Sequence, residues 1–111
     1  MASRYLTWLK KFEGKKITTD LEERSLRDQD LQLSEWNGIV TITMETLYRP
    51  YRGCSLATGL HIIQDQEGLI RKLDITADVY GEDGLGDVNP NEVWKEDDYL
   101  AAKAWLEDIT K

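Results

Sequence analysis

The stretch Gly38–Tyr48, GIVTITMETLY, decides the fold of this chain. Within it, side chains of two kinds alternate with a period of two, and β-branched residues are frequent. This pattern predicts a strand with one buried and one exposed face. The alternating sets are Val40, Ile42, Met44 and Tyr48 on one side and Thr41, Thr43, Glu45 and Leu47 on the other.

Two more strands are predicted downstream of this stretch. One runs from about Leu56 to Gln64, and the turn sequence at 65–68, DQEG, closes a hairpin into another strand around 73–79. Between the first two strands, Pro50 cannot donate to a sheet ladder and Gly53 permits a turn. We therefore expect the first strand to stop at about Tyr48 and three antiparallel strands to follow one another.

Both ends of the chain carry helix signals. Ser3 is a suitable cap for a first helix with a basic outer face, which Gly14 would end. We interpret this segment as a terminal helix docked on the core rather than as a membrane-surface or polyanion contact. A closing helix is predicted from roughly Asp97 to Ile109, after a short helical start capped by Asn89.

Residues 17–36 give mixed signals. Thr19-Asp20-Leu21-Glu22 has the form of a capping box and predicts the start of a helix. Apolar residues on both sides of it, including Leu31 and Leu33, alternate as they do in strands. The sequence does not decide between helix and strand for this region.

The composition is that of one small folded domain. Hydrophobic residues make up 41% of the 111 residues and charged residues 32%, which is close to ordinary globular usage. The single cysteine, Cys54, gives no reason to expect an oxidising compartment, and no apolar stretch approaches a membrane span. We expect one cytoplasmic α+β domain over 1–111: an antiparallel sheet of three to five strands, with N- and C-terminal helices on one face.

Charge is distributed unevenly along the chain. Residues 1–56 carry nine Lys/Arg and eight Asp/Glu, whereas residues 57–111 carry five and thirteen, and the whole chain has a net charge of −7. Such an acidic surface attracts basic partners and speeds association with them. We predict a partner-binding surface with aromatic anchors, made of Glu82, Asp83, Asp87, Glu96, Asp97, Asp98, Trp94, Tyr99 and Trp105.

An alternative site lies in the interrupted part of the first strand. Tyr48, Arg49, Tyr51 and Arg52 interleave aromatic faces with guanidinium groups, a pattern that can stack on bases and pair with phosphates. Lys10 and Lys11 of the first helix would extend it into one positive patch. The net acidity of the chain opposes this alternative.

No arrangement of residues favours catalysis or a bound metal. Cys54 and His61 would point to opposite faces of a continuous strand unless Gly59 introduces a bulge. Asp87, Asn89, Asn91 and Asp98 have the spacing of calcium-loop ligands, but Glu92 stands where that loop needs glycine. Helix capping explains the same residues, so we expect no cofactor and no metal.

These observations favour a non-enzymatic module that binds a basic protein, such as an inhibitor, an immunity-type protein or an assembly factor. A phage or mobile-element inhibitor that mimics nucleic acid is a specific form of this hypothesis. The alternatives are a nucleic-acid-binding module and, less favoured, a small enzyme. A homodimer formed through the strand at 38–48 also stays open.

Overall fold

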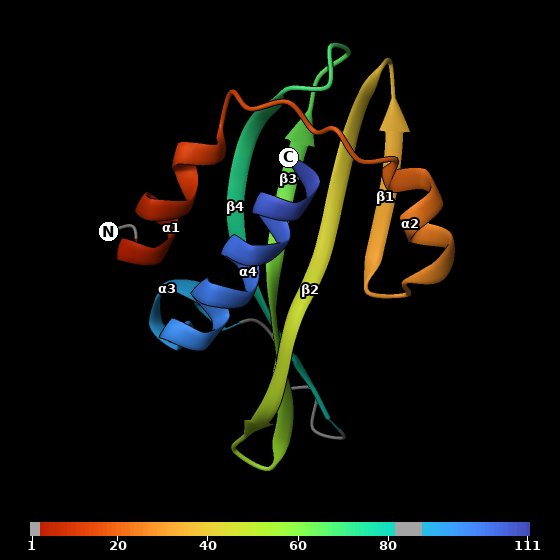
Figure 1. Ribbon diagram of the computed structural model, residues 1–111. Helices are drawn as coiled ribbons and strands as arrows, with labels where there is room; N and C mark the ends of the chain where they lie inside the picture. Colours follow the sequence, from red (N-terminus) through yellow and green to blue (C-terminus); the bar gives the residue numbers. More distant parts are fainter. Residues whose placement is uncertain (1–2, 82–87) are drawn as a thin grey trace.

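The computed structural model describes residues 3–81 and 88–111, and in these residues four antiparallel strands form one sheet in the order β1-β2-β3-β4. Each strand pairs with the next one along the chain, so the sheet is a meander (Figure 1). The strands are β1 (Leu31–Trp36), β2 (Ile39–Tyr51), β3 (Cys54–Gln64) and β4 (Ile70–Tyr80). The predicted α+β class is confirmed.

Helices from both ends of the chain cover one face of this sheet, as predicted (Figure 1). Their buried side chains join those of the strands in one apolar cluster. The helices are α1 (Arg4–Leu9), η1 (Lys10–Phe12), α2 (Leu21–Arg27), α3 (Pro90–Val93) and α4 (Glu96–Ile109). None of them is long and apolar enough to cross a membrane.

Alternate residues of the strands form the core face of the sheet. Ile42 of β2 lies opposite Ile62 of β3, which lies opposite Leu73 of β4, and all three side chains are buried. Each such side chain contributes about 1.5–3 kcal/mol by leaving water. The buried face of α4 that covers them consists of Asp98, Ala102, Leu106 and Ile109.

Strand β2 is longer than the sequence predicts, and this corrects the expected stop at Tyr48. It continues through Pro50 to Tyr51, and the turn lies at Arg52 and Gly53, both with positive φ. Pairing with β1 ends at Met44, so among the described residues the second half of β2 has a strand on one side only. A proline is tolerated there because an edge position does not require its missing N–H.

Residues 17–36 contain both of the predicted kinds of structure. Helix α2 begins after Asp20, whose Oδ1 accepts a hydrogen bond from the Glu23 N–H at 3.2 Å, so the cap lies one residue after Thr19. Strand β1 follows and pairs with the first half of β2. The helix signal and the strand signal in this region therefore came from two consecutive elements, α2 and β1.

The N-terminal helix is docked on the core, as interpreted from the sequence. Its apolar residues, including Leu9, are buried together with Phe12 of η1. Lys10 and Lys11 remain exposed. The Ser3 hydroxyl oxygen caps the helix by accepting a hydrogen bond from the Tyr5 N–H at 3.0 Å.

Candidate functional site

The predicted acidic surface is divided by the fold. Glu96 and Asp97 are exposed in the first turn of α4. Glu82, Asp83 and Asp87 lie outside the described residues. The part of this surface that the structure describes is therefore a small acidic area at the start of one helix.

Asp98 does not belong to that surface, and the prediction that placed it there is wrong. Its side chain is 0% exposed, because it lies on the face of α4 that packs on the sheet. Both carboxylate oxygens lie 2.6 Å from Nη1 of Arg49 on β2. The structure thus joins two residues that the sequence assigned to competing sites.

The Asp98 carboxylate is fully hydrogen-bonded in this position. Besides Arg49, the Thr58 hydroxyl donates to Oδ1 at 2.8 Å and the Lys95 N–H donates to Oδ2 at 2.7 Å. Nη2 of Arg49 also donates to the carbonyl oxygen of Val93. These contacts fasten α4 and the end of α3 to the second half of β2, which indicates a structural role.

The predicted aromatic anchors have separate roles. Trp94 is 5% exposed and its indole N–H donates to the Thr76 carbonyl at 2.9 Å, so its expected place at the surface is wrong. Trp105 is partly buried against the core. Tyr99 of α4 is half-buried against α1 and meets Trp8 edge-on, with ring centroids 5.2 Å apart. Trp8, which the sequence analysis did not select, is 47% exposed.

The predicted polyanion site is also partly occupied by internal contacts. Arg49 is paired with Asp98, and the Tyr48 hydroxyl donates to Asp30 at 2.6 Å. At the hairpin turn, Arg52 lies over the ring of Tyr51, 5.2 Å from its centroid.

The expected joining of this site to the lysines of the first helix is wrong. Lys10 and Lys11 belong to η1, which lies beside β4, away from the tip of the β2–β3 hairpin (Figure 1). One continuous positive patch therefore does not form from these two segments.

A hydrogen-bonded group of carboxylates and phenols surrounds Glu45 of β2, and Tyr80 of β4 reaches it across β3. Tyr80 donates to the Glu45 carboxylate at 2.6 Å, and the Tyr48 hydroxyl shares its single proton between Glu45 and Asp30. The bond to Glu45 raises the pKa of Tyr80 to about 12. The pKa of Tyr48 is raised too, first by its bond to Asp30 and then by its bond to Glu45. Carboxylate acceptors favour the neutral phenol, which explains both directions.

In the residues that the structure describes, neither the Cys–His pair nor the calcium-type ligand set is assembled. Cys54 and His61 lie on the same strand with no inserted residue between them, so their side chains point to opposite faces of the sheet. Asn89 caps α3 by accepting a hydrogen bond from the Asn91 N–H, as the capping interpretation predicted. Of the remaining calcium-type positions, Asp98 is engaged by Arg49 and Asp87 lies outside the described residues.

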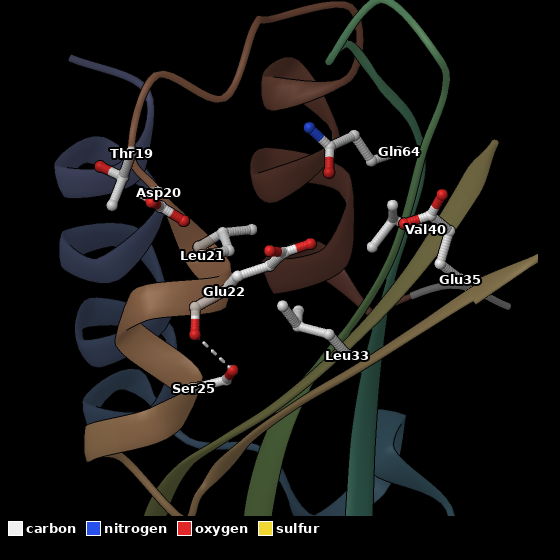
Figure 2. Close-up of a pocket in the computed structure, with 9 residues that line it drawn as sticks. All are labelled: Thr19, Asp20, Leu21, Glu22, Ser25, Leu33, Glu35, Val40 and Gln64. Atoms are coloured by element: carbon white, nitrogen blue, oxygen red, sulfur yellow. Dashed lines mark hydrogen bonds between the residues drawn. The ribbon is translucent and has the colours of Figure 1, made fainter.

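A groove that the sequence analysis missed lies between α2 and the β1–β2 pair (Figure 2). Its volume is about 460 Å³, within the range of ligand sites. Apolar side chains form its floor, and carboxylates stand on its walls. The lining residues are Thr19, Asp20, Leu21, Glu22, Ser25, Leu33, Glu35, Val40 and Gln64.

One sequence signal could have revealed this groove. Alternate residues of β1 lie on the core side of the sheet, and these are Leu31, Leu33 and Glu35. A carboxylate therefore occupies a position where the alternating pattern predicts an apolar residue. Glu22 reaches the same groove from α2 (Figure 2). The signal was hidden because residues 17–36 could not be divided into helix and strand from the sequence.

Comparison of the chain with family models, with curated proteins and with solved structures finds no match.

Proposed function

We propose that this protein is a non-enzymatic binding module that engages a basic surface of another protein. The observation that carries the proposal is the groove between α2 and β1–β2, where carboxylates surround an apolar floor. Apolar contact supplies binding energy, and the carboxylates select a positively charged partner and speed its approach. An inhibitor, an immunity-type protein or an assembly factor would each use such a surface.

The acidity of the chain supports the same proposal. A net charge of −7 on 111 residues gives the whole molecule a negative field, and Glu96 and Asp97 add to it on exposed positions of α4. The nucleic-acid alternative has less support, since Arg49 and Tyr48 already bond to carboxylates within the protein.

The first test is a pull-down from lysate of the native host, with and without nuclease, followed by mass spectrometry. We expect a stoichiometric protein with a basic surface that survives nuclease treatment. Competition for that protein by DNA or RNA would support the specific form of the proposal, an inhibitor that mimics nucleic acid. Recovery of nucleic acid alone, or of proteins that are lost with nuclease, would contradict the proposal.

A further inference from the structure

The groove between α2 and β1–β2 extends beyond the cavity shown in Figure 2. A second hollow of about 320 Å³ shares Glu35, Val40 and Gln64 with it and continues toward the β1–β2 and β3–β4 turns at Gly38 and Gly68. Together they form one elongated depression. An elongated depression suits an extended chain segment better than a compact small molecule.

The floor and walls of this groove differ in chemistry. Leu33 and Val40 are half-buried and pack against the core, leaving apolar surface at the bottom. Figure 2 shows the side chains of Glu22 and Glu35 on opposite sides of the groove, directed toward the space above its apolar floor. A ligand there meets apolar surface along its length and negative charge at its polar end.

Within the described part of the chain, these wall carboxylates have no cation of their own. The arginines of α2 are used elsewhere: Arg24 pairs with Asp108 at 2.5 Å and Arg27 with Glu23 at 3.5 Å. Across residues 3–81 and 88–111, neither Glu22 nor Glu35 takes part in an ion pair. The groove therefore presents uncompensated negative charge to an incoming group.

A lysine or arginine side chain matches this arrangement. In the described part of the chain, no three or more His, Cys, Asp or Glu residues gather closely enough to hold a metal ion. A long aliphatic stem that ends in a cation can instead lie on apolar surface while its charge reaches the carboxylates. A phosphate-bearing ligand would be repelled by the same carboxylates.

We propose that this groove docks an extended basic segment of the partner protein, with a lysine or arginine stem on Leu33 and Val40 and its cation between Glu22 and Glu35. The inference rests on the proposed function and adds to it the binding site and the chemistry of the bound segment. It places recognition at α2 and β1, whereas the sequence predicted it in the acidic C-terminal third of the chain, between Glu82 and Trp105.

The test uses a capped oligolysine peptide as the probe, titrated at low salt into the full chain while the methyl signals of Leu33 and Val40 are followed by NMR. The groove variant carries Glu22→Gln and Glu35→Gln. The matched control carries Glu96→Gln and Asp97→Asn, which removes the same charge outside the groove. All four positions are exposed, so we expect both variants to fold, and thermal unfolding is the check.

We expect the methyl signals to shift to saturation and the groove variant to bind roughly tenfold more weakly, against about twofold for the control. An oligomer of acetylated lysine, which lacks the cation, should not shift the signals. The inference is overturned if both variants weaken binding equally, or if the methyl signals do not move.

The pull-down separates this inference from the proposed function. A partner that binds the wild type and the groove variant equally well would refute the groove and leave the function intact. Failure to recover a protein partner, with the peptide still binding at Leu33 and Val40, would refute the function and leave the groove as a site for basic chains.

Discussion

The carboxylate of Asp98 shows how a single residue can decide the geometry of this fold. Burying an ionised carboxylate costs several kcal/mol unless its oxygens are paired and hydrogen-bonded. Here Arg49, Thr58 and the Lys95 N–H supply those bonds. Because the donors come from β2, β3 and the start of α4, the bonds form only when these elements are correctly placed.

Replacing Asp98 should therefore destabilise the protein strongly. We expect Asp98→Ala to lower the free energy of unfolding by about 3–5 kcal/mol, because Arg49 loses its partner in a partly buried site. Urea unfolding measures the loss. The neighbouring Asp97→Ala, at an exposed position, should stay within about 0.5 kcal/mol of the wild type. Equal effects of the two substitutions would show that the buried pair contributes nothing specific.

The bonds that Tyr48 and Tyr80 donate to Glu45 predict a tyrosine titration shifted to high pH. The folded-state pKa of Tyr80 is about 12 against an ordinary 10.0, so the neutral phenol is favoured in the folded protein. The stability from this bond is fully present below pH 10.0 and is lost as the pH rises toward about 12.

Glu45→Gln tests this effect by removing the carboxylate charge. We expect phenolate absorbance to appear at lower pH in the variant, because Tyr80 loses its charged acceptor and Tyr48 keeps only Asp30. Glu35→Gln, which bonds to neither tyrosine, is the control. Superimposable titrations of Glu45→Gln and the wild type would refute the assignment of the shift to this carboxylate.

At the scale of elements, the pairing of β2 with β3 depends on Gly59. This residue lies opposite Glu45, where the register shifts between Glu45 and Leu47 and leaves a bulge in β2. A Cβ at position 59 would lie 2.2 Å from the Met44 carbonyl oxygen, a backbone atom that cannot move without disturbing the ladder. The close approach of the two strands at the bulge therefore requires a glycine at position 59.

Gly59→Ala should accordingly lower the free energy of unfolding more than the same substitution at Gly53 in the hairpin turn. We expect a loss of more than about 2 kcal/mol in the free energy of unfolding, since the added methyl group forces the strands apart. Gly53→Ala meets no atom within 4 Å and carries only the cost of its positive φ, about 1 kcal/mol. Chemical denaturation of both variants gives the comparison, and a smaller loss for Gly59→Ala would contradict the steric explanation.

The sequence predicted those features that depend on local patterns. The alternation around Val40 and Ile42 located the central strand, and Ser3 and Asn89 marked two helix starts. The pairing of Arg49 with Asp98 spans 49 residues, and no local pattern specifies a contact between positions so distant. The groove was hidden for the same reason, because its walls come from separate elements that only the folded chain brings together.

At the scale of the whole molecule, the net charge and the groove should act on different steps of binding. Long-range attraction depends on the summed field, so it controls how fast a basic partner arrives. Groups that contact the bound partner control how slowly it leaves. A change in exposed charge outside the groove should therefore act on the association rate, and a change inside it on the dissociation rate as well.

The pair Glu96→Lys and Asp97→Lys tests the long-range effect without disturbing the buried Asp98. Each substitution reverses one exposed charge, so we expect the association rate with the recovered partner to fall several-fold and to depend less on salt, with little change in the dissociation rate. Glu67→Lys with Glu107→Lys makes the same charge change at other exposed positions. A similar fall for both pairs, measured by stopped-flow mixing, would assign steering to the whole field. A fall for the α4 pair alone would show that Glu96 and Asp97 contact the partner directly, and an unchanged rate for both would remove electrostatic steering from the proposal.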